Sequence, residues 1–344
     1  MKIYKYNQPF ITESGGSIPG IEIAYDTWGK LNEKGDNVIW VCHALTANSD
    51  VEVWWPGMVG KDMVLDINRY FVVCANILGS CYGTTGPLSV NPATSHPWLN
   101  DFPVITVRDV VRLHEILRIS LGISSVHSII GSSIGGYQAL EYSIMYPDVI
   151  QRLIFIASNA KQSPWAIAFN ESQRLSIEAD STFFGNNPEG GKSGLKAARS
   201  IALLSYRTAY AYNHTQAEET DEKTGSFRAS SYQAYQGDKL VNRFNAWSYY
   251  RLTQLSDSHN AGRGRGGVIN ALKMIKAYVL CIGIKSDILY PVEEQKFVAE
   301  NVEKGEYTEI DSFFGHDGFL IEAGQVSEVI KKFRENSSLK LEEK

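Results

Sequence analysis

The sequence predicts an α/β fold in which helices cover both faces of a mostly parallel sheet. Short runs of consecutive apolar residues recur along the chain, as expected for strands that are buried on both faces. Helical patterns separate these runs in the first half, which is typical of the crossovers that join parallel strands. The strand-like runs stop near residue 161 and resume near residue 278, so we expect one helical insertion.

The first half of the chain carries the clearest elements of this fold. Apolar residues recur at helical spacing over Val107–Leu121, with Thr106 as the predicted N-cap and Gly122 as the predicted C-terminal stop. A second helix is predicted over Ile134–Tyr146, where Pro147 ends it. The apolar runs that predict buried strands are Val38–Cys42, Phe71–Ala75, Val126–Ile130 and Leu153–Ala157.

The second half of the chain predicts the insertion and the return to the sheet. Helical patterns over Leu195–Ala211 and Asp238–Leu255 alternate with polar segments, and no strand pattern interrupts them. We expect one discontinuous α/β core, residues 1–160 and 276–344, with residues 161–275 as a helical lid inserted between two strands. The elements predicted after the insertion are strands Tyr278–Ile284 and Tyr307–Ile310 and a helix over Val326–Phe333.

Composition excludes several classes of protein. Of 344 residues, 44% are apolar and 21% charged, which is ordinary for a globular protein. No stretch approaches the roughly 18 apolar residues of a transmembrane helix, and the N-terminus lacks a signal-peptide core. A net charge of −5 without a basic block argues against nucleic-acid binding. Four cysteines are too few for a disulfide framework, and no His or Cys cluster has metal-ligand spacing, so we expect a cytoplasmic protein without a metal.

The strongest chemical signal is a G-x-S-x-G motif, Gly131–Gly135, between a predicted strand and a predicted helix. At such a junction the serine occupies a strained turn, the nucleophile elbow, and its hydroxyl projects from the carboxyl edge of the sheet. The glycines keep the crowded turn free of Cβ clashes. We therefore predict Ser133 as the nucleophile of an acyl-transfer enzyme.

A serine nucleophile needs a base and a group that orients the base. Asp287 follows the predicted strand over Tyr278–Ile284, and His316 follows the last predicted strand. This order along the chain, serine then acid then histidine, matches the order that accompanies a nucleophile elbow. We predict that His316 takes the proton of Ser133 and that Asp287 orients His316 and stabilises its charged form.

An oxyanion hole needs two backbone N–H groups beside the serine. Ile134 follows the nucleophile and supplies the first predicted donor. The segment His43–Asn48 follows an early strand, and within it we predict the amide of Leu45 as the second donor. His43 is predicted to hold this loop in place.

Several segments resemble those of homoserine O-acetyltransferases, a family of acyltransferases with the α/β-hydrolase fold. The resemblance covers nearly the whole chain, insertion included. It is carried by Trp40–Thr46, Gly79–Pro87, Gly131–Gln138, Ala168–Glu171, Ser205–Arg207, Tyr235–Lys239, Arg243–Ala246 and Gly315–Leu320.

The resemblance implies a substrate pair and a mechanism. Acetyl-CoA, a co-substrate rather than a bound cofactor, would acylate Ser133, and the hydroxyl of L-homoserine would then attack the acyl-enzyme in a ping-pong reaction. The product, O-acetyl-L-homoserine, feeds methionine biosynthesis. Matching positions imply Ser133, Asp287 and His316 as the triad, Arg207 as the partner of the homoserine carboxylate and Asp317 as the partner of its ammonium group. The family also implies a helical lid and a homodimer formed through it.

Some departures from the family pattern leave alternatives open. The elbow reads Gly-Ser-Ser-Ile where the family often has Gly-Gly-Ser-Met, and Ala47 stands where glycine is frequent. Alternatives are therefore a homoserine O-succinyltransferase, a serine O-acyltransferase, an esterase with water as acceptor, and a non-catalytic binding module. The intact serine, aspartate and histidine set argues against the last.

Overall fold

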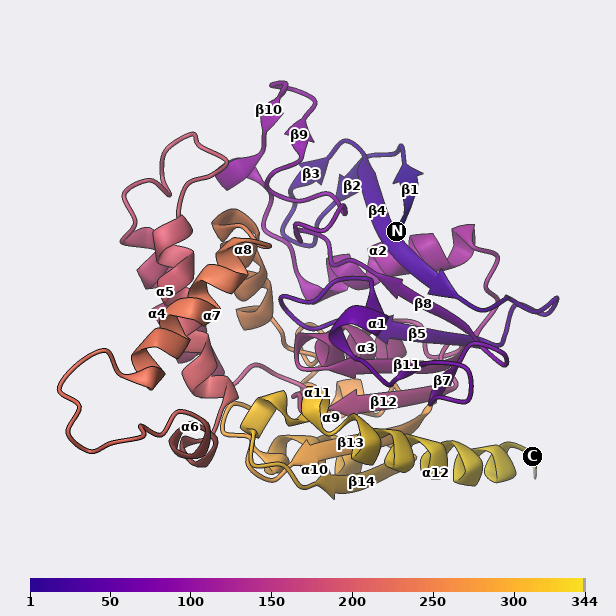
Figure 1. The fold of residues 1–344 in the computed structure, drawn as a ribbon. Coiled ribbons are helices and arrows are strands. Elements are labelled where there is room, and N and C mark those ends of the chain that lie inside the picture. The colour runs from indigo at the N-terminus through magenta and orange to yellow at the C-terminus, as the bar shows by residue number, and fades with distance from the viewer. Residues whose placement is uncertain (343–344) are drawn as a thin grey trace.

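One eight-stranded sheet runs through the centre of the molecule (Figure 1). The structure is a computed structural model that describes residues 1–342. The six strands β8, β5, β11, β12, β13 and β14 pair in parallel, and β4 and β1 extend the sheet in antiparallel fashion at one edge. In spatial order the strands are β1 Lys2–Tyr6, β4 Ile21–Trp28, β8 Phe71–Ala75, β5 Val38–Cys42, β11 Val126–Ser132, β12 Arg152–Ile156, β13 Tyr278–Ile284 and β14 Gly305–Ile310.

The predicted strands are confirmed with small shifts at their ends. The sheet contains Val38–Cys42, Phe71–Ala75 and Tyr278–Ile284 with the predicted bounds. The strand predicted to end at Ile130 continues to Ser132, because it keeps pairing with β12 up to the elbow. Three small two-stranded sheets lie outside the main one: β2 Phe10–Ile11 with β3 Ser17–Ile18, β6 Val59–Gly60 with β7 Leu65–Asp66, and β9 Val90–Asn91 with β10 His96–Pro97.

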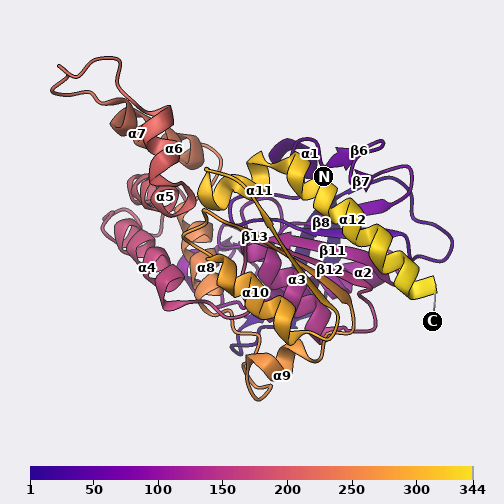
Figure 2. The ribbon, with the colours of Figure 1, turned by 90° about the horizontal axis from the view of Figure 1, so that it is seen from below.

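Helices cover both faces of the sheet, as the continuous apolar strands predict (Figure 2). In β5, Val38 and Trp40 belong to the core on one face, whereas Ile39 and Val41 belong to the core on the other. The first core is completed by α2 Val107–Ser120, α3 Ile134–Met145 and α10 Val292–Asn301. The second is completed by α1 Val51–Trp54 and α12 Ala323–Glu342. A 3₁₀ turn Leu99–Asp101 precedes α2, and a second one, Gly315–Asp317, leads into α11 Gly318–Ile321.

Helix α2 forms as its sequence predicts. Thr106 is the N-cap of a capping box in which the carboxylate of Asp109 accepts a hydrogen bond from the amide of Thr106, at 2.9 Å. Gly122 follows the helix with φ +70°, a conformation that glycine adopts without Cβ strain. Local sequence chemistry therefore fixes both ends of this helix.

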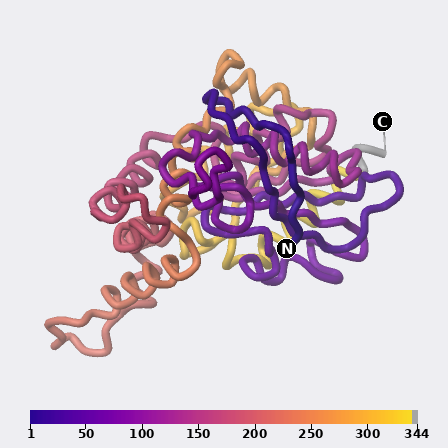
Figure 3. Tube along the Cα trace, turned by 90° about the horizontal axis from the view of Figure 1, so that it is seen from above, coloured from indigo at the N-terminus to yellow at the C-terminus, as the bar shows by residue number. Residues whose placement is uncertain are grey.

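Between β12 and β13, which are neighbours in the sheet, the chain forms the helices α4–α9. Helices α4–α8 pack beside the carboxyl ends of the strands, whereas α9 lies next to α10, and the connection between α6 and α7 projects away from the sheet (Figure 2 and Figure 3). The helices are α4 Pro164–Glu178, α5 Lys192–Tyr206, α6 Ala209–Thr215, α7 Arg228–Val241, α8 Ala246–Asp257 and α9 Val268–Leu272.

Two helical patterns of the insertion are each divided in the structure, which corrects the prediction. The pattern over Leu195–Ala211 breaks at Arg207, whose backbone is extended, and Thr208 caps a new helix. The pattern over Asp238–Leu255 breaks after Val241, and Asn245 caps α8 with its side chain. At both breaks the helix ends, and a nearby arginine contacts the α/β core. Arg207 pairs with Asp317, and Arg243 donates to the carbonyl of Thr46.

The glycine-rich loop Gly262–Gly267 is attached to the core by buried charges. Arg265 and Arg108 both contact the buried carboxylate of Glu141, at 2.5 and 2.9 Å. Arg263 and Arg108 likewise share the carboxylate of Glu13, at 2.8 and 3.0 Å. The arginines of this loop therefore serve the packing of the loop against α2 and α3. Among residues 1–342, no helix has both the length and the apolar composition needed to cross a membrane.

We predict that Glu141→Gln lowers the free energy of unfolding by about 3 kcal/mol, since it leaves two arginines facing a neutral amide in a largely dry site. Urea unfolding at unchanged m-value measures the loss. Asp148→Asn is the matched control, because the ion pair of Asp148 with Lys276 is exposed on both sides; its expected cost is below about 0.5 kcal/mol. Equal losses in the two variants would contradict a structural role for the Glu141 cluster.

Candidate active site

Ser133 occupies a strained turn between the end of β11 and the start of α3. Its φ of +55° and ψ of −128° are rarely adopted by residues other than glycine. Two hydrogen bonds hold the turn: the Ser133 amide donates to the Ile156 carbonyl at 3.1 Å, and the Ser158 hydroxyl donates to the Ser133 carbonyl at 2.7 Å. Both partners come from the end of β12, so the neighbouring strand fixes the elbow.

The two glycines of the motif permit close backbone contacts around the elbow. A Cβ on Gly131 would lie 2.1 Å from the carbonyl oxygen of Gly135, and a Cβ on Gly135 would lie 2.1 Å from that of Cys42. No larger residue fits either position without moving the backbone. The motif therefore brings the first turn of α3 against the end of β5, where the predicted oxyanion loop begins.

Asp287 and His316 form a buried hydrogen-bonded pair. The Nδ1 atom of His316 lies 2.7 Å from Oδ2 of Asp287. The other carboxylate oxygen of Asp287 accepts hydrogen bonds from the amides of Leu289 and Tyr290, at 2.8 and 3.0 Å. Both carboxylate oxygens are thus occupied, which fixes the ring orientation of His316 and favours a proton on Nδ1.

The predicted triad residues lie at the same edge of the sheet. Ser133, Asp287 and His316 follow the carboxyl ends of β11, β13 and β14, and Ser133 and His316 line one cavity of about 590 Å³. His316 is 3% exposed and packs between the rings of Tyr290 and Phe319, with centroids 5.1 and 5.5 Å away. This arrangement is that expected of a catalytic triad of serine, histidine and aspartate. The roles of the three residues remain predictions.

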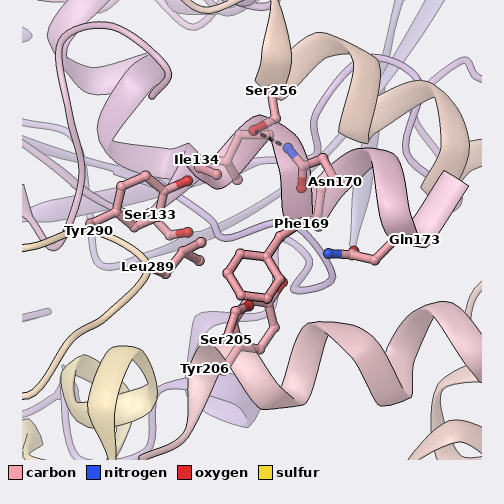
Figure 4. Close-up of a pocket in the computed structure, with 12 residues that line it drawn as sticks. Ser133, Ile134, Phe169, Asn170, Gln173, Ser205, Tyr206, Ser256, Leu289 and Tyr290 are labelled. Atoms are coloured by element: carbon pink, nitrogen blue, oxygen red, sulfur yellow. Dashed lines mark hydrogen bonds between the residues drawn. The ribbon is translucent and has the colours of Figure 1, made fainter. Parts of the chain in front are cut away.

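The predicted oxyanion donors also meet at Ser133. Ile134 is the first residue of α3, where an amide has no acceptor within the helix, and Leu45 lies in the loop after β5. Both residues line, with Ser133, a second and smaller cavity of about 20 Å³ (Figure 4). The geometry is compatible with their predicted role, because both flank the nucleophile.

His43 holds the oxyanion loop rather than reaching the cavity. Its Nδ1 lies 2.8 Å from the Ala44 carbonyl, and its Nε2 accepts a hydrogen bond from the Ile77 amide at 3.2 Å. Burial lowers the pKa of His43 to about 4, so the ring is neutral and can accept through Nε2 at neutral pH. These contacts agree with the structural role predicted for this histidine.

Arg207 and Asp317, the residues with predicted roles toward the acceptor, contact each other. The Nε of Arg207 lies 2.6 Å from Oδ2 of Asp317. Asp317 lines the larger cavity beside His316, and the Arg207 guanidinium lies over the ring of Phe314, 5.5 Å from its centroid. The structure therefore joins the two residues beside the histidine, in an ion pair that the sequence did not predict.

Two groups of lining residues were missed by the sequence reasoning. The smaller cavity is lined by neutral polar side chains of the insertion, including Asn170, Gln173 and Ser205 (Figure 4). The larger cavity is lined by three cationic side chains, Arg199, Lys239 and Arg243. Asn170, Lys239 and Arg243 stand in segments that carry the family resemblance, and that was the only available signal for them.

The cysteines do not contribute a reactive group to the site. All four are free thiols, and burial raises the pKa of each, to about 11 for Cys81, the least buried of them. A raised pKa keeps a thiol protonated and poorly nucleophilic at neutral pH. Within residues 1–342, no group of three His, Cys, Asp or Glu side chains is arranged to hold a metal ion.

A parallel sheet with a serine elbow and a buried histidine–aspartate pair defines the class of α/β-hydrolase-fold proteins. The family model described as alpha/beta hydrolase fold matches residues 37–323. Within this class, the chain belongs to the homoserine O-acetyltransferase family. It is 48% identical to a homoserine O-acetyltransferase of Cyclobacterium marinum, over 96% of this chain and 94% of that protein. It is 42% identical to one of Trichormus variabilis, over 98% of this chain and 94% of that protein.

Solved structures agree on the fold. A homoserine O-acetyltransferase from Bacillus anthracis superposes with a TM-score of 0.90 at 25% identity, over 97% of each chain. Esterase E22 superposes equally well, with a TM-score of 0.90 at 23% identity, over 97% of this chain and 99% of that one. The second match shows the fold alone, and the two together show that this fold serves both a transferase and an esterase.

We predict that Gly135→Ala destabilises the protein by at least about 2 kcal/mol, because the added methyl group overlaps the Cys42 carbonyl. Thermal unfolding followed by circular dichroism measures the change. Gly324→Ala in α12 is the control, since a Cβ there meets nothing within 4 Å and alanine favours helix by about 0.5–1 kcal/mol. A Gly135→Ala protein as stable as the parent would show that the elbow is not closely packed.

Proposed function

We propose that the protein transfers an acetyl group from acetyl-CoA to the hydroxyl of L-homoserine and forms O-acetyl-L-homoserine for methionine biosynthesis. The observation that carries this proposal is the full-length relationship to homoserine O-acetyltransferases, joined with a serine, histidine and aspartate set at one sheet edge. The reaction is a double displacement through an acyl-serine. No cofactor remains bound between turnovers.

The proposed first step acylates the serine. The Ser133 hydroxyl attacks the thioester carbonyl while His316 takes its proton, and the negative charge on the tetrahedral oxygen is stabilised by the amides of Leu45 and Ile134. Asp287, held by two backbone amides, stabilises the imidazolium. The intermediate then collapses, the carbon–sulfur bond breaks, and His316 returns the proton to the departing CoA sulfur.

In the second step the acetyl group leaves Ser133 and passes to the hydroxyl of homoserine. His316 takes the proton of the homoserine hydroxyl, the oxygen attacks the acyl-serine carbonyl, and the ester bond to Ser133 breaks as His316 returns the proton to its oxygen. Water competes with homoserine at this step. Deep burial of His316 among the rings of Tyr206, Tyr290 and Phe319 limits the access of water to the base.

The smaller cavity supports acetyl over succinyl as the transferred group. At about 20 Å³, it has room beside Ser133 for a group the size of one or two water molecules, which suits the methyl end of an acetyl group. A succinyl group is longer and ends in a carboxylate. The residues that line this cavity include no lysine or arginine to receive that charge.

The larger cavity supports a coenzyme A thioester as the donor. Its cationic side chains Arg199, Lys239 and Arg243 lie around the cavity that leads to Ser133 and His316. Coenzyme A carries several phosphate groups, which pair with arginine and lysine through charge-assisted hydrogen bonds. The volume of about 590 Å³ lies in the range of small-molecule sites.

The ion pair of Arg207 and Asp317 supports an amino acid as the acceptor. A zwitterion carries the two charges that this pair already matches, a carboxylate for Arg207 and an ammonium group for Asp317. When homoserine binds, its carboxylate pairs with Arg207 and its ammonium group pairs with Asp317, so that two ion pairs replace one. These two contacts then fix the orientation of the homoserine side chain. Water as acceptor offers neither charge.

We further propose that the protein acts in the cytoplasm as a homodimer. Free thiols at all four cysteines are consistent with a reducing compartment. Dimer formation through the insertion is supported by large apolar side chains that are exposed on its helices and connections: Leu175, Leu204, Tyr210, Phe227 and Tyr235.

We predict that free thiol is released from acetyl-CoA in sustained turnover only when L-homoserine is present, and that Ser133→Ala lowers the rate by at least about 10⁴-fold. A thiol-reactive dye follows the release, and succinyl-CoA and L-serine replace each substrate in turn as controls. Sustained release without acceptor would indicate an esterase. Release with succinyl-CoA alone would contradict the acetyl assignment, and no release with any pair would favour a binding module.

We predict that Arg207→Ala raises the KM for L-homoserine by about 10- to 100-fold with a smaller effect on the KM for acetyl-CoA, because a charge-assisted contact to the carboxylate is lost. Steady-state kinetics with each substrate varied in turn measures both constants. Lys239→Ala is the reciprocal control and is expected to raise the KM for acetyl-CoA instead. An unchanged homoserine KM in Arg207→Ala would remove Arg207 from its role toward the acceptor.

A further inference from the structure

A third cavity, separate from the two at Ser133, lies at the opposite edge of the sheet. Its volume is about 460 Å³, and it is bordered by the β6–β7 segment, the residues before β8 and the second half of α12. In Figure 1 these elements gather near the C-terminal end of the chain, away from the helices of the insertion. Tyr70, directly before the amino end of β8, borders this cavity, and the lining shares no residue with the cavity at Ser133.

A buried arginine lines this cavity with unused donors. Arg334 on α12 is 8% exposed, and its Nη1 donates to the carbonyl of Val64 at 2.5 Å. Its Nε and Nη2 atoms are buried and have no hydrogen-bond partner. The guanidinium also lies over the ring of Tyr70, 5.4 Å from its centroid. Two of its three nitrogens are therefore buried without a partner, in a side chain that borders the cavity.

Other cations surround Arg334 without an acidic partner. Arg152, which is 2% exposed, donates to the hydroxyls of Ser337 and Ser338, at 2.7 and 3.0 Å, and both acceptors are neutral. Burial, reinforced by the charges of Arg152, Arg334 and Arg69, lowers the pKa of His127 to about 3. Among the described residues, none of these three arginines forms an ion pair with a carboxylate.

The carboxylates that line the cavity are engaged elsewhere or lie at its rim. One oxygen of Asp66 accepts hydrogen bonds from the amides of Asn68 and Asp62, at 3.0 and 3.4 Å, within its own turn. Asp62 and Glu335 are exposed and form no ion pair with the arginines. Lys331 and Arg69, both exposed, add two cations at the rim. The buried part of the site is thus cationic, and the acids lie at or near its opening.

A buried guanidinium that lacks a counter-ion is costly because its charge is desolvated, and an oxyanion with two oxygens to accept its hydrogen bonds is its best partner. We propose that this cavity is a binding site for a small molecule that bears a phosphate group, with the phosphate held between Arg334 and the rim cations Arg69 and Lys331. The cavity is larger than a phosphate ion, so it accommodates an organic part beside the phosphate.

The test uses the full chain and thermal unfolding, with inorganic phosphate and ribose 5-phosphate as probes. At 10 mM and an ionic strength matched with sodium chloride, each probe is expected to raise Tm by about 2 °C or more. Arg334→Met is expected to abolish this gain, whereas Lys5→Met, an exposed lysine on β1, is expected to keep it. Inorganic phosphate can also enter the cavity at Ser133. The difference in Tm gain between Arg334→Met and Lys5→Met therefore decides whether the probe binds at Arg334.

If Arg334→Met folds poorly, the double variant Arg69→Gln, Lys331→Met tests the same site. It replaces only exposed side chains. It is expected to weaken binding of both probes at least fivefold in isothermal titration. Binding of inorganic phosphate but not of ribose 5-phosphate would overturn the assignment to a phosphorylated small molecule. No gain in Tm over chloride, or an equal gain in the parent and the variants, would overturn the site altogether.

Discussion

The parallel pairing of β11, β12, β13 and β14 is the constraint on which the candidate active site depends. Ser133, Asp287 and His316 are far apart in the chain, yet each follows the carboxyl end of a strand in this set. Parallel strands place all such ends at one edge, and the loops that follow need only short reach to meet there. The strained backbone of Ser133 is tolerated because Ile156 at the end of β12 and Ser158, just beyond that strand, form hydrogen bonds to both sides of it.

The insertion is attached to the same edge through the loops that carry the chemistry. Arg207 pairs with Asp317, next to His316, and the hydroxyl of Thr208 donates to the carbonyl of Phe313, at 2.5 Å. Arg243 donates to the carbonyl of Thr46, in the loop that carries the predicted oxyanion donor Leu45. These contacts join the helices of the insertion directly to the loops that carry His316 and Leu45.

The sequence predicted local features and the contact of Asp287 with His316, whereas contacts between the insertion and the core were not predicted. The cap at Thr106 follows from an interaction with Asp109, three residues away, and the bounds of Val38–Cys42 follow from a run of consecutive apolar residues; both were predicted. The break at Arg207 was missed because the pattern around it is helical and the interaction that ends the helix comes from Asp317. The same holds for the lone guanidinium of Arg334, since an unmatched charge becomes visible only when its surroundings are known.

The fold by itself does not decide between transfer and hydrolysis, because an esterase and a homoserine O-acetyltransferase superpose on this chain equally well. The decision must come from side chains that distinguish an amino acid from water at the acyl-serine. The insertion supplies them: neutral amides and hydroxyls around the small cavity, and Arg207 held against Asp317. The ion pair of Arg207 with Asp317 lies beside His316, and it favours an acceptor that carries a carboxylate and an ammonium group over water, which carries neither. In the proposed mechanism, transfer is therefore a property of the insertion, and the sheet edge supplies the predicted nucleophile, base and oxyanion donors.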